Sequence, residues 1–357
     1  MSVELPARLG AAIARELEGV SRKGLAERAQ RTSQAYRAGR GSAGVIRDGA
    51  DALAYALTRL PATYAACLRV LQEARRRAPG FTPASLLDAG SGTGAASWAA
   101  LEAWPDLGRI EWLDSNPSFL AFAAALAAGG PQPLATADQR CGDLTAGGFP
   151  TADLVIASYA LAEIAPERQA TVAGDLWGAA SGLLALVEPG TPAGFARLRA
   201  AREGLVAAGA SILAPCPHEN ACPLVGEDWC HFSVRLPRSR DHRIAKAAEV
   251  PFEDERYAYL IAARPGVAHT PSAARILAPP RSGKPGIDLK LCTPAGLEAR
   301  FVPRRDKPAY ALARRLGWGD GVESSASGDK PPLTLSSARS SQPCPPGTSR
   351  ERRVRDP

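Results

Sequence analysis

A glycine-rich loop, DAGSGTG at residues 88–94, constrains the fold of this chain more than any other feature of its sequence. The apolar run SLLDA leads into the loop, and an alanine-rich helical pattern follows it. Glycine lets the backbone turn sharply and approach a ligand, and the helix behind the loop presents free amide groups. The loop therefore predicts a strand–turn–helix unit of the kind that binds a nucleotide-like cofactor.

Further apolar runs follow at the spacing of alternating strands and helices. They are found at residues 110–116, before Cys141, at 153–161 and at 182–190. Strands that alternate with helices in this way form a parallel sheet covered by helices on both faces. The sequence therefore predicts an α/β fold.

Two features of the loop favour S-adenosylmethionine over NAD as the ligand. The acid Asp88 comes just before the first glycine, and Gly90, Gly92 and Gly94 follow the spacing G-x-G-x-G. The dinucleotide fingerprint instead has the spacing G-x-G-x-x-G. Together with the strand pattern, this predicts a class I, Rossmann-like, S-adenosylmethionine-dependent methyltransferase fold.

Two further acids are placed to contact the same cofactor. Asp114 closes the second predicted strand, where an acid accepts hydrogen bonds from ribose hydroxyls. Asp143 follows the third strand, where it could meet the adenine amino group. No catalytic residue can be assigned: the segment after the fourth strand has neither Asn-Pro-Pro-Tyr nor a cysteine, and Tyr159 and Glu163 suit structural roles equally well.

Three cysteines, Cys216, Cys222 and Cys230, lie within fifteen residues, with His218 and His231 among them. Clustered thiolates are typical ligands of soft metals. The spacing is not that of a zinc ribbon, and Cys292 is the best distant candidate for a fourth ligand. Four thiolates suit either zinc or a [4Fe-4S] cluster, and spacing alone does not decide between them. Three unrelated buried thiols are the structural alternative.

Positive charge gathers in one segment of the chain. Residues 235–315 carry 17 basic and 8 acidic side chains, whereas residues 1–234 carry 20 and 23. A basic segment on a slightly acidic body predicts contact with a polyanion, although it could also serve solubility alone. The candidate RNA-binding residues are Arg235, Arg238, Arg240, Arg243 and Lys246.

Several stretches taken together resemble the small-ribosomal-subunit methyltransferase-like family, whose members occur in mitochondria and in bacteria. They are PATYAACLRVL (61–71), DAGSGTGAASW (88–98), PCPHENACPL (215–224), DWCHFSVRLPRSRDHRIAK (228–246), PFEDERYAYLIAAR (251–264), LKLCTP (289–294) and ARRLGWGD (313–320). The resemblance covers about residues 50–320.

This resemblance implies a class I methyltransferase fold and a [4Fe-4S] cluster bound by cysteines. It carries the cluster ligands over to Cys216, Cys222, Cys230 and Cys292. It carries the cofactor site over to Asp88, Gly90, Gly92, Gly94 and Asp114. It also implies binding to the small ribosomal subunit and its rRNA, in support of assembly and translation. Methylation of rRNA, of a protein or of a small molecule is the alternative function.

The 357 residues divide into four expected regions. These are an N-terminal helical region at 1–80, an S-adenosylmethionine-binding core at 81–210, a cysteine-cluster and basic RNA-binding region at 211–320 that completes the fold, and a tail at 321–357. The tail is rich in Ser, Pro and Arg, which predicts disorder.

Location and assembly state follow from what the sequence lacks. No apolar stretch approaches the roughly 18 residues of a membrane span. The N-terminus, MSVELPARLG, has no apolar core followed by a cleavage site, so it is not a secretory signal. We therefore expect a monomeric protein in the cytoplasm with no membrane partner.

Overall fold

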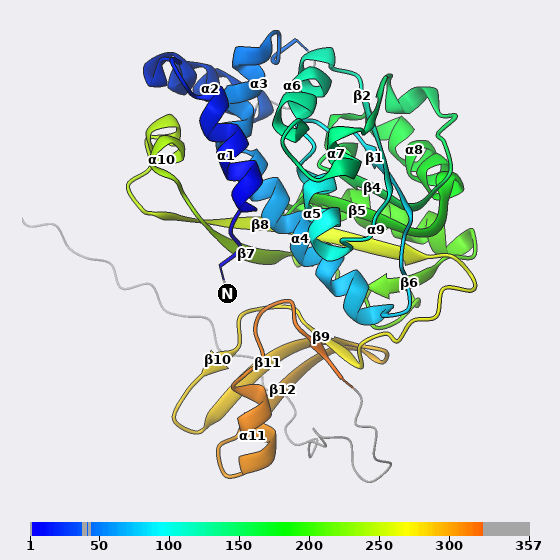
Figure 1. Cartoon of the computed structure of the whole chain (residues 1–357). Helices are drawn as coiled ribbons and strands as arrows, with labels where there is room; N and C mark the ends of the chain where they lie inside the picture. The colour runs from blue at the N-terminus through cyan, green and yellow to red at the C-terminus, as the bar shows by residue number, and fades with distance from the viewer. Residues whose placement is uncertain (1, 38–40, 42–43, 324–357) are drawn as a thin grey trace, which may run out of the picture.

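The computed structural model describes residues 2–37, 41 and 44–323, so most of the tail expected at 321–357 lies outside the described residues (Figure 1). The helices are α1 (Ala7–Glu16), α2 (Arg22–Arg37), α3 (Gly49–Thr58), α4 (Leu60–Arg77), α5 (Ala95–Ala103), α6 (Pro117–Ala127), α7 (Gln132–Ala135), α8 (Pro166–Ala179), α9 (Pro192–Ala207), α10 (Arg240–Lys246) and α11 (Lys307–Ala313), with 3₁₀ turns at Leu144–Ala146 and Leu161–Glu163. The strands are β1 (Ser85–Ala89), β2 (Arg109–Asp114), β3 (Asp138–Cys141), β4 (Ala152–Ser158), β5 (Ala180–Pro189), β6 (Ser211–Ala214), β7 (Phe232–Pro237), β8 (Phe252–Ala263), β9 (Ala274–Ile276), β10 (Arg281–Ser282), β11 (Gly286–Thr293), β12 (Gly296–Pro303) and β13 (Gly321–Val322).

A large mixed sheet forms the centre of the molecule. Its strand order is β3-β2-β1-β4-β5-β8-β6, and β7 pairs with β8. Strands β1 to β5 are parallel, as the sequence predicts, but β8 runs antiparallel to β5, β6 and β7. The parallel sheet predicted from residues 85–190 is therefore confirmed for β1 to β5, and β6 to β8 make the complete sheet a mixed one. The chain reverses between β7 and β8, so β8 enters between β5 and β6 in the opposite direction.

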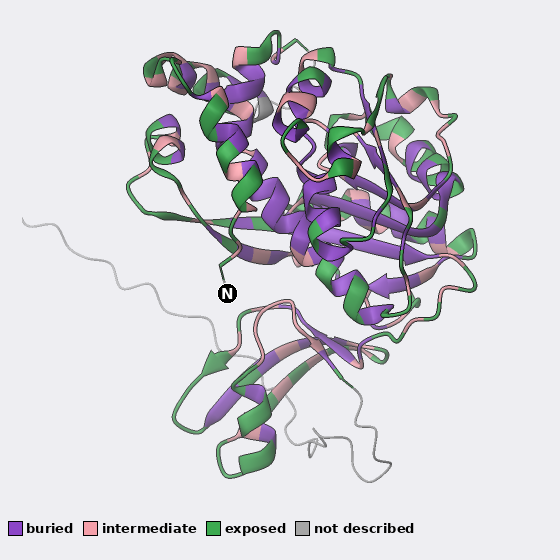
Figure 2. Cartoon of the chain, viewed as in Figure 1, coloured by how far each residue is buried: buried purple, intermediate pink, exposed green. Residues whose placement is uncertain are grey.

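Helices cover both faces of this sheet, and the core lies in the two layers between them. One apolar cluster joins α1 to α6 to one face, and a second joins α8 and α9 to the other. The inner strands β1, β4 and β5 and the helix sides that face them are almost entirely buried, whereas the edge strand β3 is exposed (Figure 2). Local signals explain where the helices begin: Pro61 opens α4, and Asp48, Asn116 and Thr191 cap α3, α6 and α9.

Residues 274–322 form a second, smaller sheet rather than extending the first. Its order is β10-β11-β9-β13, and β12 pairs with β11 along its whole length. Ile276, Leu289, Leu291 and Val302 are buried between this sheet and α11. Figure 1 shows the small sheet beside the C-terminal half of α4 and the strands β6 to β8.

Ionic contacts tie the small sheet to α4. Arg275 of β9 is 1% exposed and donates to Glu73 of α4 over 2.8 Å. Arg77 also pairs with Glu73, over 3.0 Å, and with Glu323. Within the described part of the chain, no helix combines the length and apolar character that a membrane span requires.

Candidate functional site

The glycine loop lies at the carboxyl end of β1, where parallel α/β sheets bind their ligands. Gly90, Gly92 and Gly94 have φ values of 72°, 53° and 78°, which side chains rarely adopt. A Cβ atom on Gly90 would lie 2.7 Å from the Cβ of Ala160, directly after β4. Glycine is therefore required at position 90 both by its backbone angle and by the close approach of the neighbouring strand's end.

Asp88 does not face the open edge of the sheet. It is completely buried, and its Oδ2 accepts hydrogen bonds from the Ser97 amide over 3.1 Å and from the Ser97 hydroxyl over 2.7 Å. Its Oδ1 is buried without a partner. Burial raises the pKa of Asp88 to about 7. The carboxyl group is thus placed to hold the loop against the start of α5.

Replacing Asp88 by asparagine is expected to remove a pH-dependent loss of stability. The folded state retains a proton that the unfolded chain, with an ordinary aspartate pKa near 4, releases. The stabilisation that this retained proton gives to the folded state is fully present below about pH 4 and is lost as the pH rises to about 7. Urea unfolding should show the wild type losing about 2–3 kcal/mol more than the variant between pH 5 and pH 8. Equal losses in the two proteins would contradict this assignment.

Asp114 links the loop to the next helix at the carboxyl end of β2. Its Oδ2 accepts from the Gly92 amide and its Oδ1 from the Asn116 amide, both over 2.8 Å. Burial raises its pKa. Asp143, after β3, is exposed and caps a short turn by accepting from the Thr145 amide over 2.7 Å. The structure thus brings Asp114 to the glycines, whereas Asp143 lies further along the same edge.

A buried polar group at the end of β4 was not assigned from the sequence. Tyr159 has φ 59°, a strained value for a bulky residue. Its hydroxyl donates to Glu255 Oε1 over 2.8 Å, and Arg59 Nη2 pairs with the same oxygen over 3.2 Å. Burial, together with the charge of Glu255, raises the pKa of Tyr159 well above 10. The three residues come from the α3–α4 junction, β4 and β8, so no local motif could have joined them.

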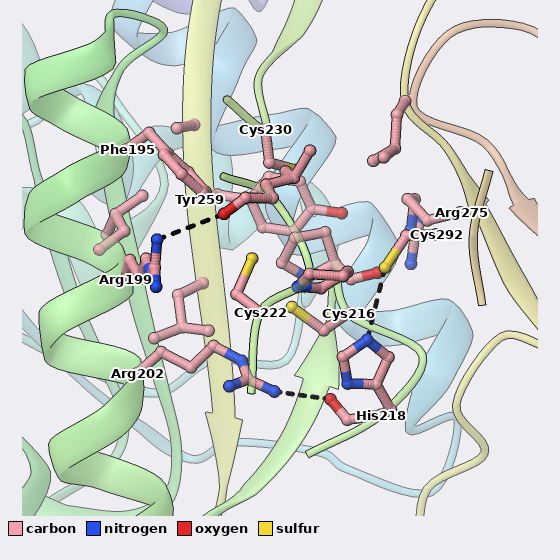
Figure 3. Close-up of a pocket in the computed structure, with 17 residues that line it drawn as sticks. Phe195, Arg199, Arg202, Cys216, His218, Cys222, Cys230, Tyr259, Arg275 and Cys292 are labelled. Carbon is pink, nitrogen blue, oxygen red and sulfur yellow. Dashed lines mark hydrogen bonds between the residues drawn. The ribbon is translucent and has the colours of Figure 1, made fainter. Parts of the chain in front are cut away.

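The four predicted cysteine ligands line a single cavity between the two sheets (Figure 3). Cys216 and Cys222 lie in the loop after β6, Cys230 precedes β7, and Cys292 comes from β11 of the small sheet. Burial raises the pKa of Cys216, that of Cys230 well above 9, and that of Cys292 to about 12. The topology therefore gathers thiols that are up to 76 positions apart in the sequence.

The cavity has donors suited to a soft metal, but its side chains do not surround a common point closely. Within the described residues, no group of three or more His, Cys, Asp or Glu side chains is arranged to hold a metal ion. His218 Nε2 lies 3.5 Å from Cys292 Sγ, and His218 Nδ1 is buried without a partner. The four cysteines are free thiols that line one cavity with His218, and donors of this kind suit a soft, thiolate-bound group.

The predicted RNA-binding residues follow β7 and α10, and most of them are already paired. Arg235 makes two bonds of 2.7 Å to Asp254. Arg238 and Lys246 both bind Glu253, over 3.2 and 2.7 Å. In the part of the chain that the structure describes, Arg240 and Arg243 have no ion-pair partner, and they line a shallow hollow together with Ile244 and Glu249. These two arginines are the ones whose charge is available to an anion.

Comparison with known proteins links the chain to ribosomal proteins. A family model described as mitochondrial small ribosomal subunit Rsm22 matches residues 49–323. The human protein named "Ribosome assembly protein METTL17, mitochondrial" is 30% identical over 286 aligned residues, covering 75% of this chain and 61% of that protein. The Rsm22-cox11 tandem protein 2, mitochondrial, of Schizosaccharomyces pombe is 26% identical over 322 residues, covering 75% and 42%. The chain thus spans less than two thirds of the length of these relatives.

Similar solved structures are methyltransferases of low identity. The magnesium protoporphyrin IX methyltransferase of Synechocystis with bound SAH is 16% identical, with a TM-score of 0.39 and coverage of 57% of this chain and 83% of that one. An O-methyltransferase family protein of Burkholderia thailandensis is 16% identical, with a TM-score of 0.40 and coverage of 67% and 68%. The strand order given above, rather than these distant likenesses, defines the α/β fold.

The expected cytoplasmic location is wrong. The matching family model is described as mitochondrial, and the human and fission-yeast relatives carry "mitochondrial" in their names. The expectation rested on the composition of MSVELPARLG. That composition gave no information about other compartments.

Proposed function

This chain belongs to the family of the mitochondrial small ribosomal subunit protein Rsm22, and from that membership we propose that it binds the small ribosomal subunit and supports its assembly. The observation that carries the proposal is the extent of the family match, residues 49–323, which includes the large sheet, the cysteine cavity and the small sheet. The human relative's name describes a ribosome assembly protein. The mitochondrial names of the relatives support a mitochondrial setting for this action.

Co-sedimentation tests the proposal. Small subunits from cells lacking this gene are mixed with the purified full chain and separated on a density gradient. The chain is expected to travel with the small subunit and not with the large one. Equal binding to both subunits would reduce the interaction to general affinity for RNA, and no binding to either would refute the proposal.

Small-subunit rRNA is the partner that the charge distribution favours. Phosphates attract positive charge that is not already neutralised by neighbouring carboxylates. Arg240 and Arg243 meet this condition, whereas Arg235, Arg238 and Lys246 are paired with Asp254 or Glu253. We therefore assign the phosphate contact to α10, with the paired residues maintaining the shape of the β7–β8 hairpin that carries it.

Replacing Arg240 and Arg243 together by alanine is expected to weaken rRNA binding and flatten its salt dependence. Each lost phosphate contact reduces the slope of log affinity against log salt by about 0.9. The double variant should therefore lose about 2 units of slope. Arg235→Ala is the matched control, because Asp254 already holds that guanidinium. An unchanged slope in the double variant, or an equal change in the control, would remove α10 as the contact.

We propose that the glycine loop binds S-adenosylmethionine. Gly90 provides backbone that a Cβ atom would block, and the loop opens into the amino end of α5. Gly90, Gly92, Gly94 and Asp114 would hold the cofactor, with Asp143 beside the adenine. When bound, the cofactor supplies an activated methyl group.

A [4Fe-4S] cluster, or zinc as the alternative, is the group that Cys216, Cys222, Cys230 and Cys292 would hold. The support is the convergence of four thiols on one cavity, which separate buried cysteines have no reason to show. When bound, the metal would cross-link the loop after β6 to the small sheet. This role is structural and fits a chain that works by binding.

Methyl transfer to small-subunit RNA is the second candidate function. The strained Tyr159 at the end of β4 favours it, because strain of this kind gathers at functional sites. Transfer of a labelled methyl group from S-adenosylmethionine to a discrete nucleotide of the small-subunit RNA would establish this activity. Tight binding without label would leave the chain as an assembly factor that retains the fold.

A further inference from the structure

One buried cation beside the cysteine cavity lacks a counter-charge. Arg202 of α9 is 4% exposed, and its Nη2 donates to the carbonyl oxygens of His218 and Asn220 over 2.8 and 2.9 Å. Its Nε is buried without a partner. Among the described residues no carboxylate forms an ion pair with it, whereas Arg197 and Arg199 on the same helix pair with Glu188 and Glu203.

A buried charge is costly unless an opposite charge accompanies it. The side chains closest in chemistry to an anion are the thiols of Cys216 and Cys292, which line the same cavity as Arg202. Neutral thiols offer dipoles but no charge. A metal group bound by four thiolates carries net negative charge, because the thiolates outnumber the positive charge of zinc or of the oxidised iron–sulfur core.

Arg275, on the other side of the cavity, differs in this respect (Figure 3). It donates to the Pro215 carbonyl oxygen over 2.8 Å, next to Cys216, and it pairs with Glu73 over 2.8 Å, a carboxylate that Arg76 and Arg77 also contact. Both arginines therefore hold the start of the loop between β6 and β7, but Arg275 has a carboxylate partner, whereas among the described residues Arg202 has none.

We propose, on the basis of the metal–thiolate group of the proposed function, that Arg202 is the positioning residue and counter-cation of that group. Its hydrogen bonds to two backbone carbonyl oxygens fix the loop that carries Cys216 and Cys222. Its positive charge offsets the negative charge of the thiolates. When the metal–thiolate group forms, its negative charge compensates the positive charge of Arg202, so the group and the arginine stabilise each other. The charge also favours the more negative of two redox states if the metal is iron.

Two variants separate the charge from the hydrogen bonds. Arg202→Gln keeps a donor for the loop carbonyls but removes the charge, and Arg202→Lys keeps the charge. The matched control is Arg168→Gln on α8, where the exposed side chain donates to the Thr145 carbonyl oxygen over 2.9 Å and does not line the cavity. All four proteins are purified without oxygen, and metal release to a chelator is timed.

Arg202→Gln should release metal about ten-fold faster than the wild type, while Arg202→Lys and Arg168→Gln stay within about three-fold. In an iron-loaded protein titrated with dithionite, Arg202→Gln should also shift the oxidised-to-reduced ratio about ten-fold towards the oxidised form, which is about 59 mV for one electron. If Arg202→Gln matches the wild type, or if Arg202→Lys fails equally, the counter-cation role is refuted. If the wild type retains no metal, the metal–thiolate group itself is refuted and this inference falls with it.

Discussion

Replacing Arg275 by methionine is expected to lower the free energy of unfolding by about 3 kcal/mol, because the buried Glu73 carboxylate loses one of its three arginine partners and two backbone carbonyl oxygens lose their donor. The guanidinium is 1% exposed and contacts four groups in three parts of the chain. It donates to Glu73 of α4, to the Pro215 carbonyl oxygen, to the Gly319 carbonyl oxygen and to the Ser272 hydroxyl. Methionine fills similar space but makes none of these bonds.

The measurement is urea unfolding, with Arg300→Met as the control. Arg300 lies in β12 of the same small sheet and pairs with Glu298 at the surface, so its loss should cost less than about 1 kcal/mol. Limited proteolysis gives a second readout, since cleavage in residues 264–273 should accelerate only in Arg275→Met. If both variants lose similar stability, Arg275 does not join the small sheet to α4.

The first five strands of the large sheet could be predicted because their signals are local. Apolar runs ending in glycine or acid, such as SLLDAG before Gly90, identify strands and the edge that binds a ligand. The direction of β8 could not be predicted, because its apolar run reads the same in either direction. Its orientation depends on the hairpin with β7, which is a tertiary pairing.

The candidate site divides in the same way. Glycine positions carry their own conformational requirement, so Gly90 and Gly94 could be identified from sequence. The partner of Arg235 could not, because Asp254 is 19 positions away and meets it only across the β7–β8 pair. Charge counted along a sequence therefore overestimates the charge available to RNA.

Replacing Cys222 by serine is expected to abolish binding to the small subunit, because the loop after β6 would lose one of the four ligands of the proposed metal group. Free energy of metal binding in small irregular modules is largely free energy of folding, on the order of 10 kcal/mol. Loss of one of four ligands should therefore release the loop from Cys292 and the small sheet. Metal content per chain, measured beside co-sedimentation with the subunit, should fall in parallel with binding.

Cys141→Ser is the control, since Cys141 is exposed at the end of β3 and does not line the cavity. It should keep both the metal and the subunit. Binding that persists in Cys222→Ser after metal has been lost would separate the two properties and assign subunit recognition to surfaces such as α10 alone. Loss of binding with the metal retained would instead place Cys222 in the contact itself. Only if metal content and subunit binding are lost together is the metal the element that holds the binding surface in shape. In that case the metal must be loaded before the chain can take part in assembly.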